Sequence, residues 1–263
     1  MAVIDVHAHV YPENLAPKAV KNIGDFYDSR TFGSGTPDDL LSVRQRAPIT
    51  HFVVHSVALT PHASTSINNF FAEQIRIHPE FIGFMALHPD SPDPEAEVQR
   101  AIDMGLCGIK LHPDMQQCDI DDPRYMRIYE IIEGRIPLIL HTGDYRSDRS
   151  SPTRLVKVLK AFPDLVVDAA HFGFWSRFDV GYDVLKDERV FVDASSSLYF
   201  VGERHMRELV RLYGTDRVLF GSDYPMWDPA REYEFFQNAG FSDDELENLL
   251  WHNAERFLGR KVE

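Results

Sequence analysis

Two histidines separated by a single residue, His7 and His9, follow an apolar run that begins at Ala2. Alternate residues of a β-strand point to the same face, so the two imidazoles are expected to lie side by side. Imidazole is a common ligand of zinc and related divalent metals. Two unpartnered imidazoles are costly to bury unless something binds them, so this pair predicts half of a metal site.

Three later apolar segments end in side chains that can also bind a metal. These side chains are His141, His171 and Asp223. An aspartate supplies a hard oxygen ligand, and it can accept a proton from water that a metal activates. If the segment ends meet, these residues could face His7 and His9 across one opening. The alternative for Asp223 is a carboxylate that stabilises the turn before the next proline.

Lys110 lies within the apolar segment Gly108–Leu111. A lysine is rarely buried without a reason. The residue type leaves three roles open. Lys110 could be carbamylated and bridge two metal ions, it could hold an anionic substrate as a cation, or it could pair with a carboxylate as a structural residue.

The segment after His141 carries two arginines, Arg146 and Arg149. Arginine binds carboxylates through two parallel hydrogen bonds, so this loop is a candidate to hold an acidic substrate. A solvated surface turn is the equal alternative. Aromatic residues that follow the ends of other segments are predicted to form the pocket wall, namely Tyr11, Trp175, Tyr199 and Trp227.

Other polar residues are expected to support the site or the fold. Asp5 and Asp193 are predicted to orient the ligand imidazoles or the loops around them. His88 and His112 each precede a proline at a segment end, where a role in lining the opening and a role in packing are equally supported. Five further histidines lie at segment starts, helix edges or turns and are expected to be structural: His51, His62, His78, His205 and His252.

To bring these side chains together, the fold must place several strand ends at one edge. Short apolar runs, typical of parallel strands covered on both faces, recur eight times and alternate with helix-like segments. The predicted strands are Val3–His7, His51–Val57, Phe81–Leu87, Gly108–Leu111, Pro137–His141, Leu165–Ala169, Val190–Asp193 and Arg217–Gly221. The predicted helices are Pro37–Arg46, Ser66–His78, Pro94–Met104, Pro123–Glu133, Pro152–Ala161, Arg177–Lys186, Glu203–Tyr213 and Pro229–Ala239, with Asp243–Leu250 and His252–Leu258 as extra C-terminal helices.

Eightfold alternation of strand and helix predicts an α/β fold, a single (β/α)8 TIM barrel over residues 1–263. An open doubly wound sheet is the alternative. The barrel is favoured because the candidate ligands follow the first, fifth, sixth and eighth strands, whose carboxyl ends ring one mouth in a closed barrel. The segment Val10–Gly35 is too long for a simple connection and is expected to form a flap over that mouth.

Composition narrows the class of protein. The chain has 263 residues, of which 44% are hydrophobic, and this is enough for a sizeable core. A net charge of −14 disfavours nucleic acids and anionic membranes as partners, and no apolar stretch is long enough to span a bilayer. Cys107 and Cys118 are the only cysteines and form no CxxC pair, which disfavours a thiolate zinc site and predicts a reducing, cytoplasmic location.

In chain order, the motifs resemble those of the amidohydrolase superfamily. The sequences Asp-Val-His-Ala-His, Gly-Ile-Lys-Leu-His-Pro, His-Thr-Gly and Gly-Ser-Asp-Tyr-Pro are similar to its amidohydrolase-2 group. That group includes aminocarboxymuconate-semialdehyde decarboxylase and related aromatic-acid decarboxylases, as well as hydrolases. The resemblance extends to Asn253-Ala254-x-x-Phe257 and therefore covers nearly the whole chain.

The resemblance implies a site with one or two ions of zinc or another divalent metal. In the two-metal arrangement, Lys110 and His171 would be further ligands. Asp223, His171 and Lys110 would be the catalytic residues. The ligands common to both arrangements would be His7, His9, His141 and Asp223.

Hydrolysis of a small amide, ester or lactone is the first expectation from this resemblance, because the chain is short for the decarboxylases and His141 is followed by Thr-Gly. Non-oxidative decarboxylation of an aromatic or unsaturated acid is the alternative. A metal-stabilised binding module is the non-enzymatic alternative. The same resemblance suggests a small-molecule substrate and a homodimer.

Overall fold

The computed structural model describes residues 2–262. Its first strand is β1 (Ile4–His9), and all 6 residues of this strand are buried. It pairs in parallel with β2 (His51–His55), and β2 pairs in parallel with β3 (Phe81–Gly83). At its carboxyl end, β1 runs beyond the predicted Val3–His7. The whole His-x-His pair therefore belongs to the strand.

The third predicted strand changes its neighbour halfway along. Its first part, β3, pairs with β2, whereas its second part, β4 (Met85–Ala86), pairs with β5 (Ile109–Leu111). Phe84 connects the two parts and donates its backbone N–H to a carbonyl of β2 at 3.0 Å. Parallel pairing then continues through β6 (Leu138–Leu140) to β7 (Val167–Ala169).

Two short strands complete the ring. β8 (Val192–Asp193) pairs with β9 (Val218–Leu219). Backbone hydrogen bonds join β7 to Phe191, next to β8, and join β1 to Phe220 and Tyr224, which follow β9. With β3 and β4 counted as one strand, the chain forms the predicted (β/α)8 barrel.

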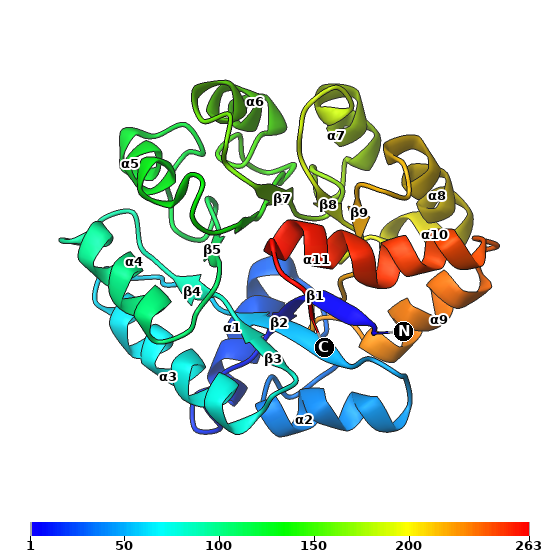
Figure 1. Ribbon diagram of the computed structural model, residues 1–263, viewed down its shortest axis with the longest axis horizontal. Helices are drawn as coiled ribbons and strands as arrows, with labels where there is room; N and C mark the ends of the chain where they lie inside the picture. Colours follow the sequence, from blue (N-terminus) through cyan, green and yellow to red (C-terminus); the bar gives the residue numbers. More distant parts are fainter. Residues whose placement is uncertain (1, 263) are drawn as a thin grey trace.

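Helices surround the barrel on its outside (Figure 1). Many begin with a proline in the first turn, where no N–H is needed and the fixed φ of proline suits a helix. Thr36 caps the first of these helices, because its Oγ1 accepts a hydrogen bond from the backbone N–H of Asp39 at 3.3 Å. None of the helices within residues 2–262 has the length and apolar character needed to cross a lipid bilayer. The outer helices are α2 (Pro37–Ser42), which continues into a 3-10 turn (Val43–Gln45), α3 (Ala63–Ile77), α4 (Pro94–Asp103), α5 (Pro123–Ile132), α6 (Pro152–Ala161), α7 (Phe178–Leu185), α8 (Leu198–Tyr213) and α9 (Pro229–Asn238).

The C-terminal helices close the amino-terminal end of the barrel. α10 (Asp243–Glu247) continues through a π-helical turn (Asn248–His252) into α11 (Asn253–Leu258), so the two predicted C-terminal helices form one continuous helical segment. Phe257 packs against Phe84 inside the barrel, with ring centroids 6.0 Å apart. Apolar side chains therefore fill this end of the barrel.

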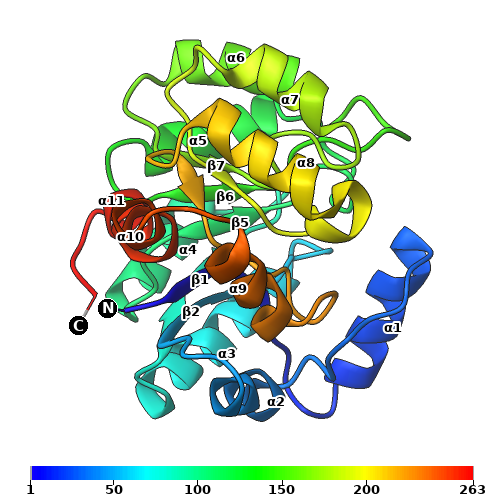
Figure 2. The same ribbon diagram turned by 90° about the vertical axis from the view of Figure 1, so that its right-hand side faces the viewer.

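The long segment after β1 contains a helix that the sequence did not indicate. Helix α1 (Ala16–Tyr27) lies within the predicted flap Val10–Gly35, and its N-cap residue, Leu15, makes no side-chain capping bond. Figure 2 shows α1 at the end of the barrel opposite the two termini. The segment therefore covers the mouth formed by the carboxyl ends of the strands, as expected of the flap.

Candidate active site

The histidines of β1 and the aspartate that follows β9 meet at the carboxyl end of the barrel. His7 is 0% exposed and His9 is 8% exposed. The distances from Asp223 Oδ1 are 3.6 Å to His7 Nε2 and 3.4 Å to His9 Nε2. Two ligands bound about 2.1 Å from a tetrahedral ion are about 3.4 Å apart. Both distances to Asp223 Oδ1 are therefore close to the separation of two ligands of one ion.

His141 and His171 extend this cluster across the barrel. His141 directly follows β6, and His171 lies two residues beyond β7. His171 Nε2 is 3.1 Å from His141 Nδ1, and the ring centroids of His171 and His7 are 5.1 Å apart. The structure thus brings together the five side chains at the ends of the first, fifth, sixth and eighth strands. Their roles as metal ligands stay a prediction.

Burial determines the charge of these groups. It lowers the pKa of His7 to about 4, and it lowers the pKa of His9, His141 and His171 as well. Burial also disfavours the ionised form of Asp223, but the contact with His9 and the nearby imidazoles outweigh it and lower the pKa of this carboxyl group below its usual value. At neutral pH the cluster therefore offers neutral imidazoles and one carboxylate, which are the forms that bind a divalent cation.

Lys110 lies beside the same cluster. Its side chain is buried, and its Nζ is 3.1 Å from His7 Nε2. Burial lowers the pKa of Lys110 to about 8, although the Asp223 carboxylate favours its charged form. The lowered pKa increases the fraction of neutral amine, which is the form that accepts a proton or reacts with carbon dioxide.

Two buried carboxylates support the cluster as the sequence suggested. Asp193 Oδ2 accepts a hydrogen bond from His7 Nδ1 at 2.7 Å, and Asp193 Oδ1 accepts one from the backbone N–H of His171 at 3.0 Å. Asp5 accepts hydrogen bonds from the side chain and the backbone of Ser222 at 2.5 and 3.0 Å. Asp193 therefore orients two of the histidines, and Asp5 anchors the turn that leads to the catalytic candidate Asp223.

The backbone is left-handed at two of the site residues. His171 and Asp223 both have a φ of 60°. Residues with a Cβ adopt this conformation rarely, and it persists where the surrounding contacts enforce it. The N–H of Asp223 donates to the carbonyl of His7 at 2.7 Å, which is one such contact. The backbone thus helps to aim both side chains at the cluster.

A cavity of about 310 Å³ opens above the cluster. Its floor is formed by the cluster and Lys110, and much of its wall comes from α1. A second, smaller cavity shares His141, His171 and Asp223 with the first. The wall of the main cavity comprises Tyr11, Ala19, Asn22, Ile23, Phe26, Tyr27, Ser56, Val57, Leu59, His112, Met115, Gln117 and Met226.

The two predicted substrate-binding arginines, Arg146 and Arg149, line neither cavity. Arg146 donates hydrogen bonds to Asp144 through Nε and Nη2, at 2.8 and 2.6 Å, and to the backbone carbonyl of Phe26 through Nη1, at 2.7 Å. It therefore ties the loop after β6 to α1. The structure does not bring either arginine to the cluster, and their contact with a substrate stays a prediction.

The predicted aromatic wall residues divide between the cavities and the surface. Tyr11 lines the main cavity, whereas Trp175 and Trp227 line the smaller one. Tyr199 is 70% exposed and stacks on Trp227, with ring centroids 4.8 Å apart. Most of this predicted wall is therefore near the site.

The remaining histidines predicted from the sequence differ in whether they line a cavity. His112 lines the main cavity, its ring stacks on His141 with centroids 3.9 Å apart, and its Nε2 lies 2.8 Å from the hydroxyl of Tyr27. His88 instead accepts a hydrogen bond from the backbone N–H of Asp90 at 3.1 Å. The five histidines expected to be structural line neither cavity.

Sequence reasoning missed His55, Tyr27 and Asp114. His55 ends β2 directly beside His9 and is fully buried. Asp114 Oδ2 lies 3.9 Å from His141 Nε2. The signal for His55 was available, because it is a further metal-capable side chain at a strand end. It was hidden by the prediction that the second strand extends to residue 57, which left His55 inside the strand.

The residues present fit a divalent metal ion. Ring nitrogens of His9, His55 and His141 have no hydrogen-bond partner within residues 2–262, which is uncommon for buried polar atoms. Several histidines joined by a carboxylate make up the donor set that zinc and neighbouring transition metals prefer. The unpartnered nitrogens of His55 and His141 support the same conclusion as the spacing of His7 Nε2 and His9 Nε2 around Asp223.

The fold and the site place this chain among the TIM-barrel proteins that gather several imidazoles and a carboxylate at the carboxyl ends of their strands. The sequence profile of the amidohydrolase family matches residues 4–260 of the chain. The chain belongs to this family, in its amidohydrolase-2 group.

Solved structures share the fold over almost the entire chain. An uncharacterised TIM-barrel protein from Bordetella bronchiseptica is 22% identical, with a TM-score of 0.79 and coverage of 98% of this chain and 99% of that one. A dihydroxybenzoic acid decarboxylase from Polaromonas, with bound manganese and the inhibitor 2-nitroresorcinol, is 17% identical, with a TM-score of 0.76 and coverage of 98% and 97%. A proposed 2-pyrone-4,6-dicarboxylic acid hydrolase from Pseudomonas putida is 20% identical, with a TM-score of 0.72 and coverage of 100% and 99%. At these identities, the likeness establishes the barrel fold.

Proposed function

We propose that this protein is a divalent-metal-dependent hydrolase that acts on a small amide, ester or lactone. The observation that carries the proposal is the position of Asp223 Oδ1, 3.6 Å from His7 Nε2 and 3.4 Å from His9 Nε2, at the floor of a cavity. These three residues and His141 would hold the ion. When bound, such an ion polarises a carbonyl oxygen and lowers the pKa of water to about 7.

The protein's own side chains would carry out the proton transfers. The ionised Asp223 accepts a proton from the attacking water. His171 Nδ1 lies 3.1 Å from the carbonyl of Ser195, which can only accept a hydrogen bond, so Nδ1 carries the proton and Nε2 presents a lone pair. That lone pair faces His141 Nδ1 at 3.1 Å, so His171 would exchange this contact for the substrate when it takes up a proton through Nε2 and passes it to the leaving group.

The cavity walls support a specific class of substrate. Helix α1 contributes Ala19, Ile23 and Phe26, and other parts of the wall are also apolar. Among the described residues that line the two cavities, Lys110 is the only lysine or arginine. We therefore expect a small molecule with an apolar body and at most one carboxylate, which Lys110 would hold.

A panel of small aryl esters and lactones tests this proposal, with the protein loaded with zinc or manganese. We expect a neutral or monoanionic compound to be hydrolysed faster than its dianionic analogue. Asp223→Asn should reduce kcat/KM by about 10²- to 10⁴-fold, which is typical of the loss of a general base. Hydrolysis at the same rate by this variant would rule out the assigned role of Asp223.

Non-oxidative decarboxylation of an aromatic acid is the second candidate. It is supported by the family, in which the structural relatives include decarboxylases of 2,6-dihydroxybenzoate and 5-carboxyvanillate. The rings of Tyr11, Phe26 and Tyr27 on the cavity wall suit a planar substrate. Release of carbon dioxide from a panel of hydroxybenzoates, without hydrolysis of any ester or lactone, would favour this reaction over the first.

A further inference from the structure

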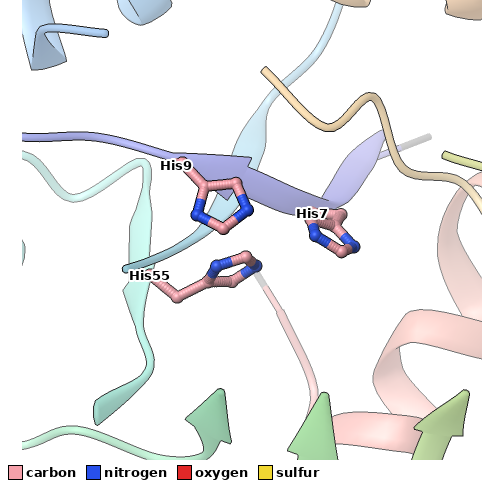
Figure 3. A group of neighbouring side chains, drawn as sticks. All are labelled: His7, His9 and His55. Atoms are coloured by element: carbon pink, nitrogen blue, oxygen red, sulfur yellow. The ribbon is translucent and has the colours of Figure 1, made fainter. Parts of the chain in front are cut away.

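A third imidazole, that of His55, lies against the histidine pair of β1. His55 is the last residue of β2, and its Cα is the register partner of His9 across the two parallel strands. Its ring meets the His9 ring edge-on with centroids 4.5 Å apart, and it meets the His7 ring in the same manner at 4.8 Å. Figure 3 shows the three rings gathered at the ends of the two strands.

Both nitrogens of this imidazole lack a partner. His55 is 0% exposed, and neither Nδ1 nor Nε2 has a hydrogen-bond partner within residues 2–262. Buried polar atoms are nearly always hydrogen-bonded, and an apolar side chain of similar size would fill the same space without this cost. Packing alone therefore does not account for a histidine at this position.

His51, on the same strand, provides an internal comparison. Its Nδ1 lies 3.0 Å from the Thr50 hydroxyl, and its side chain is only partly buried. A histidine of β2 with an ordinary structural role thus finds both a hydrogen-bond partner and solvent. His55 has neither.

His55 can also share a metal ion with the histidine pair of β1. A neutral imidazole has one nitrogen lone pair, and no hydrogen bond within residues 2–262 occupies that of His55. Each of the three histidines offers a nitrogen that lies within 4.8 Å of the nitrogens offered by the other two.

We propose that His55 is a further ligand of the metal centre and forms a three-imidazole face with His7 and His9. This inference rests on the proposed metal centre but not on the reaction that the centre performs. Adding an imidazole shifts the preference of a site towards zinc, cobalt, nickel and copper and away from magnesium and calcium, which favour oxygen ligands. The preference of the site for particular metal ions would thus depend partly on His55, a residue of β2.

The test measures metal binding rather than turnover. Metal-free protein is titrated with Zn²⁺ against a competing chelator, for the wild type, His55→Leu and the matched control His51→Leu. We expect the affinity of His55→Leu for Zn²⁺ to fall by at least about 10- to 100-fold, the range found when even an indirect metal contact is lost. His51→Leu should bind as the wild type does.

A spectroscopic measurement gives a second readout, and the polar variant His55→Gln guards against a folding defect that is specific to His55→Leu. Nitrogen couplings in the electron paramagnetic resonance spectrum of the Cu²⁺-loaded wild type should report an imidazole that is lost in His55→Leu and also in the polar variant His55→Gln. Wild-type affinity and an unchanged spectrum in both His55 variants would overturn the inference and leave the proposed function intact. Failure of the wild type to bind any of these ions would instead overturn the metal centre itself, and the role of His55 with it.

Discussion

The Asp193 carboxylate holds the imidazole of His7 through a hydrogen bond of 2.7 Å between Oδ2 and Nδ1, with both side chains fully buried. Burial opposes the ionisation of Asp193, but the contact with His7 outweighs it and lowers the pKa of the carboxyl group well below its usual value. An ionised carboxylate can only accept a hydrogen bond, so Nδ1 carries the proton. Nε2 of His7 therefore carries the lone pair that a metal ligand needs, and it faces Lys110 Nζ at 3.1 Å and Asp223 Oδ1 at 3.6 Å.

Removing the charge of Asp193 tests this relationship. Asp193→Asn should weaken metal binding by about 10- to 100-fold, because the ligand histidine loses the partner that fixes its tautomer and raises its basicity. A chelator-competition titration of the metal-free protein measures the change. Asp187→Asn, an exposed position between α7 and β8, is the matched control and should bind as the wild type does. Unchanged affinity in Asp193→Asn would show that His7 does not depend on this carboxylate.

Removal of the metal separates a catalytic ion from a structural one. A structural zinc site is closed by protein ligands and contributes directly to folding, whereas a catalytic site keeps a position for the reactant. The barrel has an extensive apolar core to which the histidines do not belong, and the histidine cluster opens into a cavity. We therefore expect chelation to abolish turnover while the far-ultraviolet circular dichroism spectrum is retained. Unfolding on chelation would instead support a metal-stabilised binding module.

The buried Glu232 on α9 predicts a pH-dependent loss of stability. Burial, with the nearby charge of Asp5, raises the pKa of Glu232 from 4.5 to about 8, and its Oε2 has no hydrogen-bond partner within residues 2–262. Between these two pH values the folded protein binds more protons at this site than the unfolded chain, so stability falls as the pH rises through this range.

Glu232→Gln should remove this loss. The free energy of unfolding is measured by denaturant titration at pH 5 and at pH 8.5. Its decrease between these two pH values should be larger in the wild type than in Glu232→Gln, by on the order of a few kcal/mol. Glu234→Gln, at an exposed position on the same helix, serves as the control. Parallel pH profiles for Glu232→Gln and the wild type would contradict the prediction.

Arg146 is expected to hold the flap in place. Its guanidinium bonds to Asp144 and to the carbonyl of Phe26, and it lies 4.9 Å from the centroid of the Phe26 ring. Arg146→Ala should therefore accelerate proteolytic cleavage within α1 even when no substrate is present. Arg149→Ala, in the same loop, should leave the cleavage rate unchanged. An unaltered cleavage rate in Arg146→Ala, together with a raised KM, would instead favour the direct contact with substrate that the sequence suggested.

The barrel could be predicted from the sequence because its strands are short apolar runs that alternate regularly with proline-initiated helices. The same regularity located His7, His9, His141, His171 and Asp223, since a metal-capable residue at a strand end can be recognised without knowing the strand's neighbours. Helix α1 was not predicted, because its N-cap, Leu15, gives no capping signal, although Pro17 in its first turn is the same start signal that the other helices carry.

Two features of the site depend on contacts that a linear pattern does not contain. The direction of Arg146 is set by Asp144, two residues earlier, and by a carbonyl of α1 that is distant in the sequence. The importance of His55 depends on the register between β1 and β2, which places it beside His9. Both relationships are properties of the folded chain.

The most direct test of the central claim is an anomalous-difference map from crystals of the zinc-loaded protein. The account predicts a peak about 2.0–2.2 Å from His7 Nε2, His9 Nε2 and an oxygen of Asp223. A peak bound elsewhere, or no peak in a protein that has been saturated with zinc, would contradict the account.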